Sequence, residues 1–227
     1  MLGAARTAWA ARAWSTSGSR TARTISVVGD AAVSTAQSKF GGTSLLNTTT
    51  PGYITVAQDA VFDFGTSQDF TIEMFGRLNT SIEGQYFFDG RADLKSVAIL
   101  MDGVFLKAYI DGAYRVGTGA NPFAADTWVH VAYTRSGTTG TLWLDGVSQG
   151  TWTDTVDYSF SNELYIGSRF SSTGANAYFD EIRISNTARY TTTFTPTTSQ
   201  FVNDANTLLL LHCNGANGST TFLDDNS

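Results

Sequence analysis

Short runs of apolar or alternating residues recur along the chain from Thr24 onward, separated by glycine, asparagine, aspartate and threonine. Each run is too short for a stable helix, and no useful segment repeats its apolar positions with helical periodicity. Alternation with a period of two predicts β-strands that bury one face. We predict strands at residues 25–28, 53–56, 70–78, 85–88, 96–101, 104–110, 128–135, 141–145, 163–167, 178–185 and 207–212.

Three Asp-Gly pairs lie between strand-like runs, at 102–103, 111–112 and 145–146. Asp-Gly tolerates the positive φ angles of a two-residue hairpin turn, so each pair predicts a hairpin. Three such pairs predict an antiparallel meander. The fold class is therefore all-β, an antiparallel sandwich or jelly roll rather than alternating strands and helices.

Alternation also predicts which side chains point away from the core. On three predicted strands the outward positions include aromatic residues: Phe75, Phe105, Tyr109 and Trp143. Because aromatic rings stack on the apolar face of a sugar, these four are the candidate ligand-binding residues. The alternative is that a neighbouring loop or a second layer covers them. Glu73 with Arg77, and Glu181 with Arg183, share strand faces and are expected to form surface ion pairs.

Charge and composition limit the classes of partner that the protein is expected to bind. Charged residues make up 15% of the 227-residue chain, and the net charge is −6. The first 23 residues carry four arginines and no acid, so residues 24–227, the predicted single domain, are more acidic still. An acidic body argues against nucleic acid and anionic membranes as partners. Residues 1–23 are rich in alanine and arginine and are expected to be a poorly ordered leader resembling a transit peptide.

Catalytic motifs are not evident in the sequence. Glycosidases of jelly-roll folds place two carboxylates on one strand face, whereas Asp180 and Glu181 are adjacent and point to opposite faces of a strand. His130 and His212 belong to neither a zinc motif nor a nucleophile–base motif, and Cys213 is the only cysteine, so an intrachain disulfide is excluded. We expect a protein that is not an enzyme.

Several segments together resemble the laminin-G-like, concanavalin A-like lectin/glucanase domains. They are FDFGTSQDFTIEMFGRL (62–78), WVHVAYTRSGTTGTLWLDGV (128–147), LYIGSRFSSTGANAYFDEIRISNTARY (164–190) and VSTAQSKFGGTSLLN (33–47). The last segment is similar to the entry segment of phage members, found in tail and virion proteins. The resemblance implies an all-β, antiparallel two-sheet jelly-roll sandwich over about residues 25–201.

The C-terminal segment NTLLLLHCNGANGSTTFLDDNS (206–227) resembles the opening strand of the same domain type. In that family it would precede a segment like 25–47. Residues 205–227 either supply the missing first strand in cis, because the termini of a sandwich often lie close together, or begin a truncated second repeat. We favour the strand in cis.

The resemblance also implies a calcium ion, since laminin-G-like domains often hold one near the sheet rim through oxygen ligands. The matching positions here are Asp180 and Asp224, with Asp30 as a weaker third ligand. The alternative is that these carboxylates cap turns by accepting hydrogen bonds from local backbone amides.

Together these features predict a non-catalytic recognition or adhesion module that binds a glycan or a protein surface, in a virion tail or capsid decoration or outside the cell. The alternatives are a carbohydrate-binding accessory domain of a secreted polysaccharide-degrading enzyme, and a purely structural virion sandwich. Jelly rolls host all three roles, so the fold alone does not choose between them.

Overall fold

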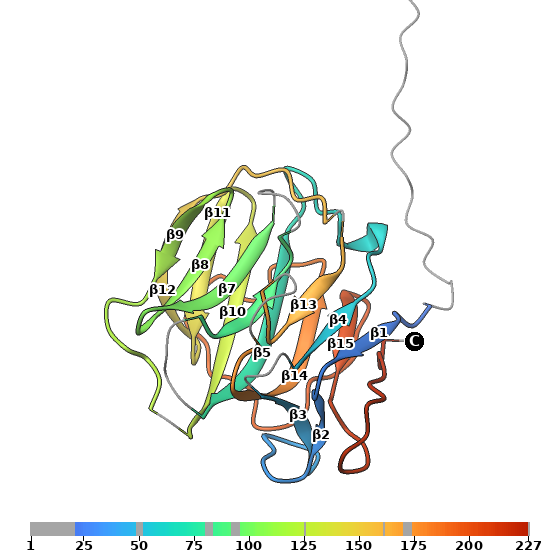
Figure 1. Cartoon of the computed structure of the whole chain (residues 1–227). Helices are drawn as coiled ribbons and strands as arrows, with labels where there is room; N and C mark the ends of the chain where they lie inside the picture. Colours follow the sequence, from blue (N-terminus) through green and yellow to red (C-terminus); the bar gives the residue numbers. More distant parts are fainter. Residues whose placement is uncertain are drawn as a thin grey trace, which may run out of the picture.

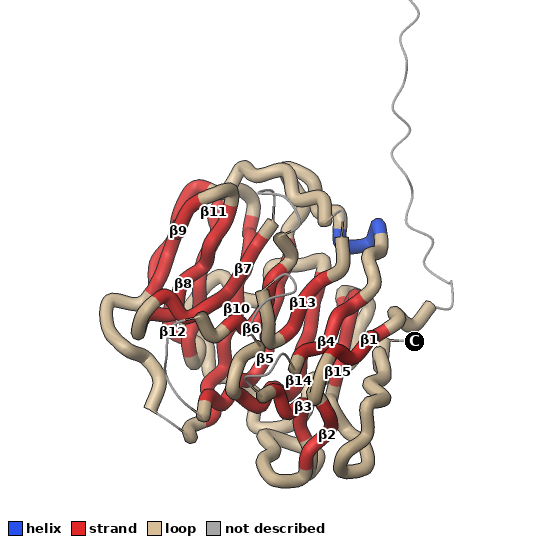
Figure 2. The backbone as a smooth tube through the Cα atoms, in the orientation of Figure 1, coloured by secondary structure: helices blue, strands red, loops and turns tan. Residues whose placement is uncertain are grey.

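The computed structural model describes residues 21–48, 52–79, 84–91, 96–124, 126–160, 162–169 and 174–226. Within these residues the chain forms two antiparallel sheets packed face to face, as the sequence predicts (Figure 1). Apart from the short 3-10 turn η1 (Ala60–Phe62), the described connections are loops and turns (Figure 2). Most of the predicted leader lies outside the described residues.

Sheet A has seven strands in the described part of the chain. In spatial order they are β1 (Ile25–Val28), β4 (Tyr53–Val56), β13 (Leu164–Ile166), β6 (Tyr86–Asp89), β7 (Val97–Asp102), β8 (Phe105–Ile110) and β9 (Ala113–Gly117). Its last three strands form a meander through the first two Asp-Gly pairs, whereas the third pair, at 145–146, forms a hairpin in the other sheet.

Sheet B has eight strands among the described residues. In order they are β12 (Val147–Thr153), β11 (Thr139–Leu144), β10 (Trp128–Ser136), β5 (Phe70–Leu78), β14 (Ala177–Ser185), β3 (Ser44–Asn47) and β2 (Ala32–Ser34), with β15 (Thr207–Leu211) paired to β14.

The core fills the space between the sheets with the inward residues of both. In β8, for example, Leu106, Ala108 and Ile110 are fully buried in the main cluster, while Phe105, Lys107 and Tyr109 alternate outward. Alternation therefore assigned the faces of this strand correctly from Phe105 onward. Val104, which was placed in the predicted strand 104–110, is exposed because it lies in the turn before β8.

Two of the three Asp-Gly pairs form the two-residue hairpin turns that the sequence predicts, and the third differs. Asp111-Gly112 and Asp145-Gly146 have positive φ at both residues, as a two-residue hairpin of this type requires. Asp102 instead stays in β7 and pairs with Phe105, so the turn consists of Gly103 and Val104. The sequence pattern missed β2, β3, β9 and β12, short or edge strands whose residues do not alternate clearly between apolar and polar.

The C-terminal segment completes sheet B. The long strand β14 pairs with β3 over Ala177–Phe179 and with β15 over Ile182–Ser185, both on the same edge. The pairing of β14 with β5 shifts register between Asp180 and Arg183. At this point the neighbour on the opposite edge of β14 changes from β3 to β15. All of β15 is buried, so residues 207–211 are an integral part of the sandwich.

The start of the described chain, ahead of β1, lies near its C-terminal segment at the end of the sandwich that carries β1 and β15 (Figure 1). The backbone N–H of Arg23 donates to Asp224 Oδ2 at 3.0 Å, and its guanidinium lies near Asp59. Arg23, predicted to belong to the leader, is thus held by the folded domain.

Candidate functional site

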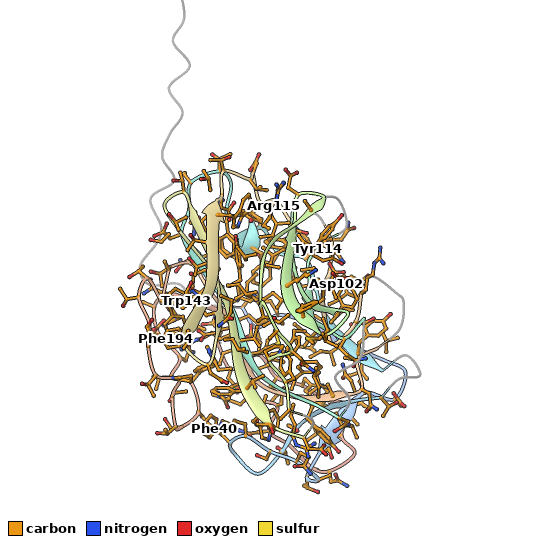
Figure 3. The ribbon with its side chains drawn as sticks, turned by 90° about the vertical axis from the view of Figure 1, so that its left-hand side faces the viewer. Phe40, Asp102, Tyr114, Arg115, Trp143 and Phe194 are labelled. Atoms are coloured by element: carbon orange, nitrogen blue, oxygen red, sulfur yellow. The ribbon has the colours of Figure 1, made fainter. Side chains whose placement is uncertain are left out.

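The four predicted ligand-binding aromatics do not form one surface. Phe75 in β5 and Trp143 in β11 lie on the outer face of sheet B, whereas Phe105 and Tyr109 in β8 lie on the outer face of sheet A. The two pairs are therefore on opposite sides of the sandwich. Figure 3 shows Trp143 beside Phe194 on one side of the molecule, away from Asp102 and Tyr114.

The outer face of sheet B is covered. Residues 186–204, which connect β14 to β15 and which we call the strap, cross it. Phe75 is only 2% exposed and packs against Phe201 of the strap, and Trp143 is 3% exposed and packs against Phe194. Neither ring is accessible to a sugar in this structure, which agrees with the alternative that a loop covers them.

A charged network holds the strap to sheet B. The buried Glu73 accepts hydrogen bonds from Arg183 Nε at 2.8 Å and from the hydroxyl of Tyr190, in the strap, at 2.7 Å. His130 Nε2 lies 3.1 Å from the same carboxylate. Burial alone would raise the pKa of Glu73, but the hydrogen bond with His130 and the charge of Arg183 hold it below its ordinary value.

This network corrects the predicted surface ion pairs. Glu73 pairs with Arg183 across β5 and β14, whereas Arg77 pairs with Asp126. Glu181, expected to pair with Arg183, instead lies 2.9 Å from His212 Nδ1 and accepts the backbone N–H of Phe201. The register shift in β14 is the physical reason, because it breaks simple alternation after Asp180.

The outer face of sheet A carries an aromatic surface on β6, β7, β8 and β9. We call it the tyrosine patch, and it comprises Tyr86, Arg91, Asp102, Phe105, Lys107, Tyr109 and Tyr114. Tyr114 is 46% exposed, the largest exposure of any aromatic side chain described. Its ring packs edge-on against Tyr109, with the ring centres 5.2 Å apart.

Strand geometry brings the patch together. Phe105, Lys107 and Tyr109 alternate outward along β8, and Tyr109 lies directly opposite Tyr114 of β9. Such directly opposed pairs are the closest side-chain contacts of an antiparallel sheet. Sequence reasoning found Phe105 and Tyr109 but missed Tyr114, although the Asp111-Gly112 turn places residue 114 beside residue 109.

Two cations are packed among the rings. Lys107 Nζ lies 4.6 Å from the ring centre of Tyr114 and 5.6 Å from that of Phe105. The Arg91 guanidinium lies 4.6 Å from the ring centre of Tyr109 and makes a bidentate pair with Asp89. These cation–π contacts fix the ring orientations.

Asp102 completes the patch. It accepts from Lys107 Nζ and from the Tyr114 hydroxyl, and the hydrogen bond from Lys107 lowers its pKa below the ordinary value, so it is ionised at neutral pH. Burial, together with the hydrogen bond to Asp102, raises the pKa of Tyr114 to about 12, so the phenol stays protonated and continues to donate. The ion pairs Asp89–Arg91 and Asp102–Lys107 each join one negative and one positive group, so neither pair carries a net charge.

Each of the three predicted calcium ligands is hydrogen-bonded within the protein. Asp180 is buried and accepts the backbone N–H groups of Lys39, Phe40 and Glu181. These three hydrogen bonds use most of the acceptor positions of the carboxylate, and two of the donors, Lys39 and Phe40, are distant from Asp180 in the sequence.

The other two predicted ligands also have hydrogen-bond partners, a backbone amide for Asp224 and a threonine hydroxyl for Asp30. Asp224 accepts the backbone N–H of Leu210 at 3.1 Å, and Asp30 is hydrogen-bonded to Thr48. Over the described ranges, no three carboxylate, histidine or cysteine side chains are grouped so that they could hold a metal ion.

No helix in the described part of the chain is long and apolar enough to cross a membrane. A comparison with curated proteins finds no match.

Solved structures with the same fold include three that bind, or are named for binding, other molecules. The binding domain of Paraclostridial Mosquitocidal Protein 1 is 15% identical, with a TM-score of 0.59 over 74% of this chain and 45% of that one. Domain 4 of AbnA, a GH43 extracellular arabinanase from Geobacillus stearothermophilus in complex with arabinotriose, is 14% identical, with a TM-score of 0.54 over 73% and 82%.

A carbohydrate-binding protein, so described, from Bacteroides ovatus ATCC 8483 is 14% identical, with a TM-score of 0.54 over 84% of this chain and 51% of that one. The chain thus spans about half the length of the first and third of these structures. At such low identity the likeness establishes the fold alone.

The model of the concanavalin A-like lectin/glucanases superfamily matches residues 48–193, which is more than half of the sequence. That match includes the FTIEMFGRL strand and the WVHVAYTR hairpin that carried the sequence resemblance. The chain is therefore a member of the concanavalin A-like lectin/glucanase superfamily, of its laminin-G-like kind.

Proposed function

We propose that this protein is a non-catalytic recognition module that binds a glycan through the tyrosine patch on the outer face of sheet A. The observation that carries the proposal is the cluster of Tyr114, Tyr109 and Phe105, whose rings are held in place by two cations at a solvent-accessible face. Aromatic faces of this kind stack on sugar rings with no need for a large pocket.

The similar structures support a binding role for this fold, because one is a toxin's binding domain and another was solved with arabinotriose. The resemblance of the VSTAQSKFGGTSLLN segment (33–47) to phage members favours a virion tail or decoration protein as the setting. The extracellular arabinanase domain favours the second setting, an accessory domain of a secreted polysaccharide-degrading enzyme.

The buried charges support a role without catalysis. Glu73 is enclosed beneath the strap with four donor atoms from His130, Arg183 and Tyr190 around it. Asp154 is likewise buried against the hydroxyls of Tyr133 and Tyr158. These carboxylates stabilise the sandwich and have no access to a substrate.

A glycan array tests the proposal. The wild-type chain, Tyr114→Ala and Tyr109→Ala would be compared with Leu223→Ala, which removes a 67% exposed side chain from the C-terminal segment, outside the patch. We expect the wild type and Leu223→Ala to bind the same glycans and both tyrosine variants to lose them. Equal binding by all four proteins, or binding of none by the wild type, would overturn the proposal.

A further inference from the structure

Within the tyrosine patch, Asp102 and Lys107 form a polar pair between two rings. Asp102 ends β7 and Lys107 lies in β8, and their side chains are ion-paired at 2.5 Å with 29% and 26% of their surface exposed. Phe105 and Tyr114 flank the pair, each within 6 Å of the ammonium. Polar groups and aromatic faces therefore meet at one accessible point.

The pair keeps hydrogen-bonding capacity that its internal contacts do not use. A carboxylate accepts about four hydrogen bonds and an ammonium donates three. Asp102 takes one from Lys107 and one from Tyr114, and Lys107 gives one to Asp102. Because both heads are partly exposed, the remaining acceptor and donor positions face solvent.

We propose that Asp102 and Lys107 are the specificity-determining residues of a subsite for a neutral sugar with two adjacent hydroxyls, a proposal that rests on the function proposed above. One hydroxyl donates to the Asp102 carboxylate and its neighbour accepts from the Lys107 ammonium. The apolar face of the sugar ring stacks on Tyr114 or Phe105. Hydrogen bonds to charged groups are the stronger ones, so this pair would dominate the choice of ligand.

The charges of the patch favour a neutral ligand over an acidic one. The charge of Lys107 is neutralised by Asp102. Arg91 is ion-paired with Asp89 and lies against the ring of Tyr109. A sugar carboxylate or sulfate placed on the subsite would meet the Asp102 charge at close range, where like charges repel.

The experiment measures binding to arabinan, galactomannan and soluble starch as neutral probes, and to polygalacturonate and heparin as acidic ones. The proteins are the wild type, Tyr114→Ala, Asp102→Asn, Lys107→Met and Arg115→Gln. Arg115 is the matched control, because it follows Tyr114 in β9 but packs on Trp152 of β12. Melting temperatures of all variants check that each is folded.

We expect a neutral polysaccharide to bind and both Asp102→Asn and Lys107→Met to weaken it at least about tenfold, the loss of one hydrogen bond to a charged group. Arg115→Gln should bind as the wild type does. Methylating the hydroxyls of the bound polysaccharide should abolish binding to the wild type. Because Lys107 lowers the pKa of Asp102, wild-type affinity should be unchanged between pH 5 and pH 8.

The outcomes separate the two proposals. If Tyr114→Ala loses the ligand while Asp102→Asn and Lys107→Met keep it, the patch binds glycan but the subsite is wrong. Preference for polygalacturonate or heparin would also overturn the subsite. If no probe and no arrayed glycan binds the folded wild type, the function proposed for the patch fails and the subsite with it.

Discussion

Replacing Glu73 with glutamine should destabilise the domain more than its small change in shape suggests. The carboxylate accepts from Arg183 at 2.7 and 2.8 Å and from Tyr190 at 2.7 Å, and all of it is buried. Glutamine removes the charge and presents an amide N–H₂ to one of these donors. Arg183, which is itself nearly buried, then lacks its counter-ion.

Breaking a buried ion pair by neutralising one partner costs about 3–5 kcal/mol, because the other charge stays buried and uncompensated. We expect Glu73→Gln to lower the free energy of unfolding by this amount. Tyr190→Phe removes one hydrogen bond to a charged group and should cost about 1.5–3 kcal/mol. Since both changes act on one network, the loss in the double variant should be smaller than the sum of the two single losses.

Urea unfolding followed by tryptophan fluorescence measures these free energies from the midpoint and the slope. Glu163→Gln is the control, because Glu163 is an exposed glutamate, and it should stay within about 0.5 kcal/mol of the wild type. A loss below about 1 kcal/mol for Glu73→Gln, with an unchanged slope, would refute the view that this network anchors the strap.

Three further predictions concern the C-terminal strand, pH and calcium. Deleting residues 205–227 removes four buried leucines in β15, each worth about 1.5–3 kcal/mol, so the truncated chain should show no cooperative melting transition; an unchanged melting temperature would contradict this. The pKa of Asp180 is raised to about 7 by burial and that of His212 is raised by Glu181, so the folded state holds extra protons. That stabilisation is complete below the unfolded pKa values and is lost as pH rises from these toward the folded ones; the melting temperature should fall between pH 5 and pH 8, and less so in Asp180→Asn. Excess calcium should leave the melting temperature equal to that in chelator, because backbone amides occupy Asp180; a rise in the wild type that is absent from Asp180→Ala would instead support a calcium site.

Much of the fold follows from the order of residue types. The two-residue periodicity of segments such as 70–78 and 105–110 predicts strands and their inward faces, because successive side chains of a strand point to opposite sides. Motifs spread over the chain were sufficient to indicate the superfamily. The edge strands β9 and β12 escaped prediction, since neither needs a continuous apolar face.

The position of the candidate site could not be predicted from the local sequence pattern. Alternation placed Phe75 and Phe105 alike as outward aromatics, and nothing in either strand distinguishes them. Phe75 is buried because the strap, more than a hundred residues later in the chain, returns across sheet B, whereas no described segment covers Tyr114 to the same degree.

The sequence by itself thus determined most of the strands, their inward faces and the family, which depend on local periodicity and on motifs. Only the tertiary structure decided which outward sheet face is open to solvent and which carboxylate neutralises Arg183. It also decided that Asp180 and Asp224 each accept hydrogen bonds from backbone amides of other segments. These features arise from contacts between segments distant in sequence, and no local pattern of residues encodes them.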